Sequence, residues 1–243
     1  MARFVRHESC PKCGSRDNLG RYDDGSAFCF GCHYYEARNG HNFIPPAVHA
    51  TEHGIGQVFS RGNDVASRAS FTLPEQCLDW ASKFGITLAD LIRAGARWDP
   101  RTESLIFLYY DKSQTLCCIQ GRSFSNNPQA TKYHNWGSTH DVIDINGSHG
   151  KTIVITEDKL SAIKVARVAD AFPALGTTFQ IHKLVTLKQL GYQRVVVWLD
   201  YDKWRESQEI ADKAKWIGLS STSVLSEEDP KCYDEDTIRK YLT

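Results

Sequence analysis

Two stretches decide the fold: KTIVITED at residues 151–158 and RVVVWLDYD at residues 194–202. Each contains a short run of β-branched and apolar residues without polar alternation, from Thr152 to Thr156 and from Arg194 to Leu199. Such runs are typical of parallel strands that are buried on both faces. Because helical patterns at 158–168 and 180–190 flank a short strand at 171–175, the segment is predicted to be a βαβαβ unit.

Acidic residues follow both main strands. Glu157 ends the first, and Asp200 and Asp202 end the second. In a doubly wound sheet the carboxyl ends of the strands meet at one edge, where ligands bind. Asp200 and Asp202 are expected to point the same way if the backbone stays extended. Carboxylate oxygens are hard ligands that suit Mg²⁺, so the pattern indicates metal-assisted phosphoryl chemistry. The alternative is that these acids are solvated loop residues or helix N-caps.

The C-terminal part continues the same pattern. A helix is predicted from Lys203 to Ile217 and a last strand from Ser221 to Leu225. Asp229 follows that strand, so it is expected at the same edge of the sheet as the other acids.

Length and composition limit the possible classes of protein. The 243 residues suffice for one large or two to three small domains. The formal net charge is zero, which excludes a general basic field for nucleic acid. No apolar run is long enough for a membrane span and no signal peptide is evident, so a cytoplasmic protein without a membrane partner is expected.

Four of the eight cysteines have the spacing of a metal site. They form two C-x2-C pairs separated by fifteen residues: Cys10, Cys13, Cys29 and Cys32. Two such knuckles on facing hairpins close a tetrahedral S4 site, which predicts a zinc ribbon at residues 1–41. Because protein ligands fill all four positions, the zinc is expected to be structural.

Aromatic and basic residues surround these knuckles. Arg16, His33 and Tyr34 are candidate DNA contacts, since such side chains stack on bases and neutralise phosphates. Packing inside a small domain is the alternative for aromatic residues here.

Between the ribbon and the parallel unit lie two further segments. Residues 42–62 contain prolines, glycines and histidines without periodicity, which predicts a linker. Residues 63–147 are predicted to be an α+β subdomain. One helix is expected after Pro74, and a second begins at a capping box of Thr87 and Asp90 and ends at Gly95. A hairpin is expected at 104–110 and 115–122. The last subdomain is then 148–243.

Cations follow the hairpin. Arg122 and Lys132 lie among turn-forming residues, where they are candidates for neutralising a triphosphate. The sequence GSHGKT at 147–152 is not a nucleotide-binding P-loop, because Ile145 replaces the required first glycine and a strand follows in place of a helix.

The order of these parts resembles the bacterial and bacteriophage DnaG-type DNA primases, which join a four-cysteine ribbon, a linker, a mixed α+β subdomain and a Toprim domain. Glu157 in ITED, the aspartate pair in LDYD and Asp229 in EEDPK match the Toprim pattern. The resemblance covers nearly the whole chain and is strongest at the ribbon and the aspartate pair. The expected fold class is therefore α/β and α+β, with a Rossmann-like parallel sheet.

The resemblance implies template-directed synthesis of RNA primers from ribonucleoside triphosphates on single-stranded DNA. Glu157 would be the catalytic acid or base, Asp200, Asp202 and Asp229 would bind Mg²⁺ or Mn²⁺, and Arg122 and Lys132 would bind nucleotide phosphates. The ribbon would read the template. A separate helicase and a DNA polymerase would be partners, since no helicase domain follows.

The chain departs from the family at one motif. The usual E-G-x-x-D is E-D-K-L-S here, with Asp158 in place of the glycine and Ser161 in place of the second acid. Either Asp158 supplies the missing carboxylate or the site has fewer ligands. Three other functions stay open: a RecR-like DNA-binding mediator, a primase-derived protein that binds DNA without polymerising, and a Toprim nuclease.

Overall fold

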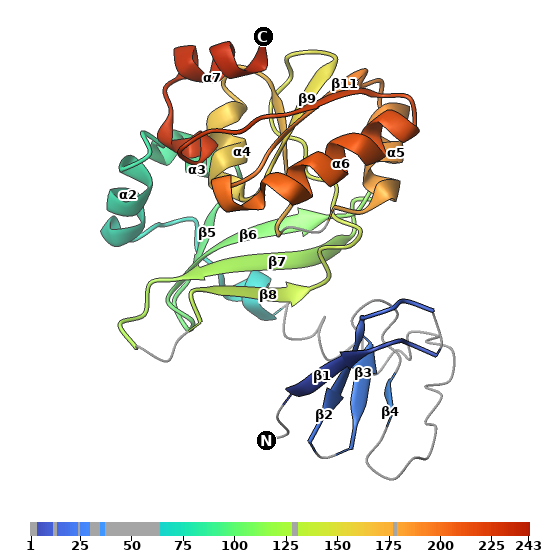
Figure 1. Ribbon diagram of the computed structural model, residues 1–243. Helices are drawn as coiled ribbons and strands as arrows, with labels where there is room; N and C mark the ends of the chain where they lie inside the picture. Colours follow the sequence, from blue (N-terminus) through green and yellow to red (C-terminus); the bar gives the residue numbers. More distant parts are fainter. Residues whose placement is uncertain are drawn as a thin grey trace. The chain divides into compact units, whose positions relative to one another are not determined.

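The computed structural model describes residues 4–11, 14–23, 25–29, 35–36, 64–127, 131–176 and 179–243. The chain divides into two compact units, Met1–Gln57 and Val58–Thr243 (Figure 1). The division falls within the predicted linker at 42–62, a segment that lies outside the described residues. Among the helices that are described, none has the length and apolar character to cross a membrane.

The N-terminal unit contains an antiparallel sheet in sequential order: β1 (Phe4–Glu8), β2 (Leu19–Tyr22), β3 (Ala27–Cys29) and β4 (Tyr35–Glu36). Its buried cluster is small and consists of Cys10, Leu19, Ala27 and Cys29. Arg21 spans the sheet, because its guanidinium contacts Glu8 at 2.8 Å and Glu36 at 2.6 Å. Among the described residues of this unit, an ion-pair network therefore supplements the apolar packing.

The first described residues of the second unit, 64–68, are helical, and a second antiparallel sheet follows them. The strands follow in sequential order: β5 (Arg97–Asp99), β6 (Ser104–Tyr110), β7 (Leu116–Ser123) and β8 (Tyr133–Gly137). The predicted hairpin is thus confirmed as β6 and β7. Gly137 has φ +95°, and a Cβ atom there would collide with the carbonyl of Cys117 on the neighbouring strand, so β8 ends at a position that needs glycine.

Two short helices pack against this sheet, α2 (Glu75–Ser82) and α3 (Leu88–Arg93). Pro74 is the N-cap of α2. The predicted capping box is present at the start of α3, where Thr87 and Asp90 bond each other's backbone N–H groups. Gly95 follows α3 with φ +73°, the left-handed conformation in which glycine commonly ends a helix.

The third sheet is wholly parallel, with the order β10-β9-β11-β12. Its strands are β9 (Thr152–Thr156), β10 (Asp170–Pro173), β11 (Arg194–Trp198) and β12 (Ser220–Ser223). Its helices are α4 (Lys159–Val165), α5 (Ile181–Gln189), α6 (Trp204–Trp216) and α7 (Glu235–Leu242). The predicted βαβαβ unit is confirmed, and the predicted combination of α+β and α/β parts is present.

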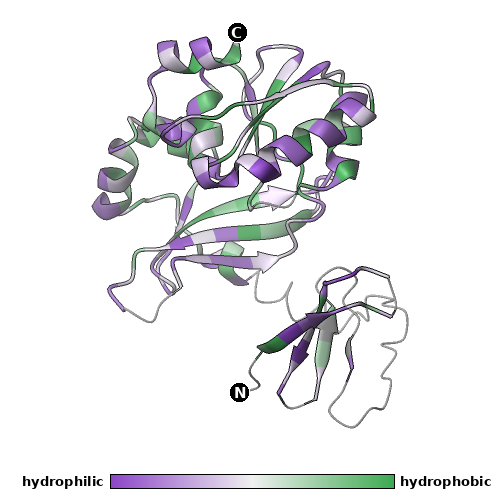
Figure 2. Cartoon of the chain, viewed as in Figure 1, coloured by the Kyte–Doolittle hydropathy of each residue, from purple (hydrophilic) through white to green (hydrophobic). Residues whose placement is uncertain are grey.

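Burial on both faces explains the uninterrupted apolar strands. Ile153 and Ile155 face one core with residues of α5 and α6, whereas Val154 faces another with residues of α4 and α7. Figure 2 shows the apolar strands inside and the polar outer faces of the helices. Alternate residues of one strand thus enter different cores, and neither set can be polar.

The antiparallel and parallel sheets belong to one unit and share a core. Leu105 and Phe107 of β6 pack in one cluster with Leu160 and Ile163 of α4. Arg167, just after α4, donates to the carbonyl of Gly85 at 2.8 Å and to Asp90 at 2.7 Å. Apolar packing and directed polar contacts thus fix one sheet against the other.

Candidate metal and nucleotide site

Four acidic residues gather at the carboxyl edge of the parallel sheet. Glu157 and Asp158 follow β9, Asp200 follows β11, and Asp229 is the N-cap of the 3-10 turn η2 (Pro230–Cys232) that comes after β12. Strand order reverses between β9 and β11, and such a switch point is where open α/β sheets bind ligands. Carboxylate oxygens of Asp158, Asp200 and Asp229 lie within 4.8 Å of one another.

These carboxyl groups influence one another's charge. Burial, together with the charges of Glu157 and Asp229, raises the pKa of Asp200 to about 7. Burial also raises the pKa of Glu157, although a backbone hydrogen bond from Asp200 opposes the shift. The Oδ1 atom of Asp200 and the Oε2 atom of Glu157 are buried without a hydrogen-bond partner among the described residues. A divalent cation would supply the partner that the Asp200 oxygen lacks, so the residues fit the implied metal.

Lys231 is the cation of this cluster. Its ammonium lies 2.6 Å from the Oδ2 atom of Asp158 and also contacts Asp229, and its side chain is 13% exposed. Neither Asp158 nor Lys231 was predicted as a site residue, although the sequence left open a role for Asp158. Asp158 also caps α4 by accepting from the backbone N–H of Ser161 at 2.9 Å, so the start of the helix fixes its position.

Asp202 lies apart from the cluster in this structure. The backbone does not stay extended after Asp200, because the chain turns into the 3-10 helix η1 (Tyr201–Lys203). The Asp202 carboxylate contacts Lys203 at 2.6 Å, is 70% exposed and is not among the three clustered carboxylates. The premise that both aspartates would point the same way is thus corrected by the turn that follows β11.

A cleft of about 660 Å³ opens beside the carboxylates. Basic and aromatic residues line it together with the acids: Trp80, Arg122, Lys132 and Tyr133. The guanidinium of Arg122, on β7, lies 4.1 Å from the centre of the Trp80 ring and 3.3 Å from the Tyr133 hydroxyl. The structure therefore brings the two cations singled out in the sequence into one cleft with the acids, and the volume is within the range of small-molecule sites.

The described part of the ribbon fits a zinc site. Cys10 and Cys29 are 2% and 0% exposed and share the same buried cluster. The carbonyl of Cys10 accepts from the N–H of Gly14 at 2.9 Å, and Gly14 has φ +70°, so the chain makes a tight turn next to Cys10. Such a turn is what a two-thiolate knuckle requires. Cys13 and Cys32 lie outside the described residues.

Of the predicted DNA contacts, only one falls within the described residues. Arg16 is exposed on the loop after the first knuckle. His33 and Tyr34 lie outside the part that the structure describes.

No protein-family model matches the sequence, and the curated proteins give no significant match. Solved structures do match in fold. The Aquifex aeolicus primase, crystallised as its zinc-binding and RNA polymerase domains, is 11% identical with a TM-score of 0.60 over 99% of this chain and 80% of that one.

Two further structures match about three quarters of the chain. The RNA polymerase domain of Mycobacterium tuberculosis primase DnaG, in complex with double-stranded DNA, is 12% identical with a TM-score of 0.56 and covers 77% of this chain and 78% of that one. A DnaG primase catalytic domain bound to single-stranded DNA is 14% identical with a TM-score of 0.56. It covers 78% of this chain and 76% of that one. The chain therefore has the fold of a DnaG-type primase core, as the resemblance implied.

Proposed function

We propose that the chain is a DNA primase, a nucleotidyltransferase that makes short RNA primers on single-stranded DNA. One observation carries the proposal: a single cleft is lined by acids and by cations, namely Glu157, Asp158, Asp200, Asp229, Arg122 and Lys132. Transfer of a nucleotide needs negative ligands for a metal ion and positive groups for a triphosphate, within the reach of one substrate. The fold shared with primases supports the same reaction.

Asp200, Asp229 and Asp158 would hold Mg²⁺ or Mn²⁺ in this cleft. Asp202 would join them only after it leaves Lys203, which its exposed position in η1 permits. When bound, the metal ion neutralises charge that develops on the phosphoryl group.

The chain's own groups perform the remaining tasks. Glu157 accepts the proton of the primer 3′-hydroxyl, and its partly buried carboxyl, with a pKa above the ordinary value, is a stronger base than an exposed glutamate. Arg122 and Lys132 bind the triphosphate, and the stack on Trp80 holds the Arg122 guanidinium in one orientation. This orientation fits bidentate recognition of phosphate.

The ribbon would bring the template to the cleft. Cys10, Cys13, Cys29 and Cys32 would hold one structural zinc ion, and Arg16, His33 and Tyr34 would contact single-stranded DNA. Arg21 is unsuited to that role despite its basic character, because its guanidinium is held by Glu8 and Glu36. A helicase and a DNA polymerase would act before and after the primer is made.

The test is incorporation of labelled ribonucleotides on random single-stranded DNA with Mg²⁺, for the unmutated chain and for Asp200→Asn. The expected result is short RNA from the unmutated chain and a loss of roughly 10²-fold or more in the variant, the typical cost of one preorganised electrostatic contact. The matched control is Asp212→Asn on α6, whose side chain is 47% exposed and does not line the cleft. Equal synthesis by the unmutated chain and Asp200→Asn would exclude this site.

A second readout separates the proposal from a binding-only function. If the unmutated chain binds single-stranded DNA but makes no RNA, even with a replicative helicase added, the primase proposal is wrong. A DNA-binding mediator is then the better description.

A further inference from the structure

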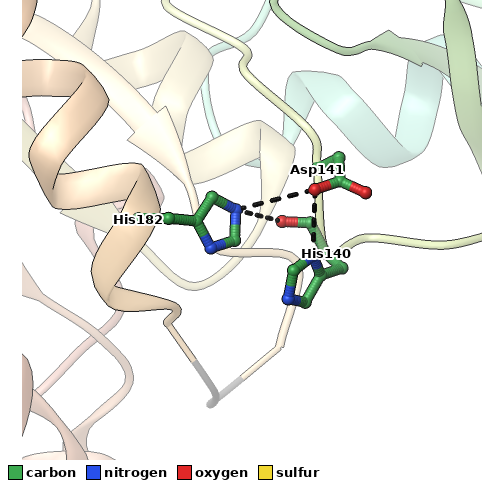
Figure 3. Close-up of side chains that lie close together, drawn as sticks. All are labelled: His140, Asp141 and His182. Carbon is green, nitrogen blue, oxygen red and sulfur yellow. Dashed lines mark hydrogen bonds and ion pairs between the residues drawn. The ribbon is translucent and has the colours of Figure 1, made fainter.

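A second cluster of possible metal ligands lies away from the acidic cleft. His140 and Asp141 are on the loop after β8, and His182 is in the first turn of α5 (Figure 3). The Oδ1 atom of Asp141 lies 2.9 Å from Nδ1 of His140 and 3.8 Å from Nε2 of His182. One ligand atom from each of the three residues lies within 4.8 Å of the others.

The arrangement directs both imidazoles at one carboxylate. The rings of His140 and His182 stack with centroids 4.5 Å apart and planes 30° apart. Nε2 of His182 also lies 3.0 Å from the carbonyl oxygen of His140, and this contact ties the start of α5 to the loop. Two ring nitrogens and one carboxylate oxygen thus lie close together, contributed by segments that lie 42 residues apart in the sequence.

We propose that His140, Asp141 and His182 form a further metal site, which takes Zn²⁺ or another borderline transition-metal ion. Imidazole nitrogen with one carboxylate oxygen suits such ions, whereas Mg²⁺ prefers oxygen alone. Bond lengths of 2.0–2.2 Å to zinc place neighbouring ligand atoms of a tetrahedron roughly 3.4 Å apart, and the observed separations from Asp141 lie on either side of that value.

The loop is already held in place for such a site. Lys183, next to His182, is buried and donates from Nζ to the carbonyl of Thr139 at 2.7 Å. This contact fixes the loop against the start of α5 without using the ligand atoms. The three side chains are 41% to 63% exposed, so they can adjust by fractions of an ångström at little cost.

A metal ion here would join the two sheets of the larger unit at their edge, since β8 belongs to the antiparallel sheet and α5 to the parallel one. Three protein ligands leave one position for water or for a ligand atom from outside. The proposal does not depend on primase activity.

The test is a Co²⁺ titration of the full chain, followed by absorption spectroscopy, with zinc already bound to the ribbon and saturating Mg²⁺ present. The expected result is one additional equivalent of Co²⁺ with d–d bands and no sulfur charge-transfer band. His182→Ala should weaken this binding at least about tenfold, because even outer-shell substitutions cost 10- to 100-fold in metal affinity. His134→Ala, outside the cluster, should bind as the unmutated chain does.

The same titration on His140→Ala guards against a folding defect in α5, because His140 is on an exposed loop. Binding that weakens in both variants, with unchanged circular dichroism, supports the site. Binding that is absent from the unmutated chain, or equal in the unmutated chain and both variants, overturns it.

Discussion

The ammonium of Lys231 lies 2.6 Å from the Oδ2 atom of Asp158 and also contacts Asp229, at the centre of the acidic cluster. Burial alone would lower the pKa of Lys231, but the two carboxylates outweigh it and the pKa is raised. The side chain therefore stays charged and acts as a tethered counter-ion for the carboxylates. Its removal should leave negative charges that repel one another, which a divalent cation can neutralise.

We expect Lys231→Met to lower the free energy of unfolding by up to about 3 kcal/mol without divalent ions, because a buried charge cluster loses its partner. Added Mg²⁺ should raise the melting temperature of this variant more than that of the unmutated chain. Thermal unfolding with and without Mg²⁺ measures both effects. Lys240→Met, at an exposed position of α7, is the control, and an equal Mg²⁺ response in the three proteins would contradict the counter-ion role.

We expect substitutions of Asp158 and Asp202 to have opposite effects on Mg²⁺ binding. Asp158→Asn should remove most of the Mg²⁺-dependent rise in melting temperature, because its carboxylate is one of the three that lie within 4.8 Å of one another. Asparagine is also a good N-cap, so α4 should keep its start. Asp202→Asn should keep the Mg²⁺ response in the absence of substrate, because its carboxylate contacts Lys203 instead.

The reverse order, with Asp202→Asn losing the response and Asp158→Asn keeping it, would show that η1 rearranges when the metal ion binds. Asp202 would then be a metal ligand, as the resemblance to the family implies.

Arg122 should bind the triphosphate through its planar guanidinium as well as its charge. Arg122→Lys keeps the charge but loses the stack on Trp80, so we expect ribonucleoside triphosphate affinity to fall about tenfold, and further in Arg122→Ala. Quenching of tryptophan fluorescence on nucleotide addition measures the affinity. The control is Arg205→Lys. In the unmutated chain the Arg205 guanidinium lies 5.3 Å from the Trp204 ring, and Arg205 does not line the cleft. Equal affinity for the unmutated chain and Arg122→Lys would mean that charge alone is sufficient.

The sequence predicted the parallel strands well, because a strand buried on both faces must be apolar throughout. The boundaries of β9 agree with the prediction, and β11 ends one residue earlier than predicted, at Trp198. Glu157 and Asp200, directly after these strands, were therefore correctly expected at the carboxyl edge of the sheet.

The rest of the site depends on contacts that no local pattern encodes. Asp202 lies beyond the end of β11, where alternation no longer decides which way a side chain points. Lys231 reaches Asp158 across 73 positions of sequence, and a lysine after three acids looks like an ordinary surface charge. Residues that act through long-range ion pairs could thus be recognised only once the fold had brought them together.

The contact between Asp90 and Arg167 should make the joint between the two sheets sensitive to acid. Burial alone would raise the pKa of Asp90, but hydrogen bonds from Thr87 and Arg167 lower it to about 2. Because the folded pKa is below the unfolded value, the charged carboxylate stabilises the protein above about pH 4, and this stability is lost as the pH falls toward 2. The shift corresponds to about 2 kcal/mol at pH 7.

Asp90→Asn should therefore unfold at lower urea concentration at pH 7, while the difference from the unmutated chain should shrink as the pH falls from 4 toward 2. Arg167→Met should show the same pH dependence with a smaller effect, because Thr87 still donates to Asp90. Asp79→Asn, on α2 and without a resolved contact to the parallel sheet, is the control. Urea unfolding at several pH values measures the free energy of unfolding of each protein. If the difference between Asp90→Asn and the unmutated chain stays constant down to pH 2, the effect comes from lost packing and not from charge.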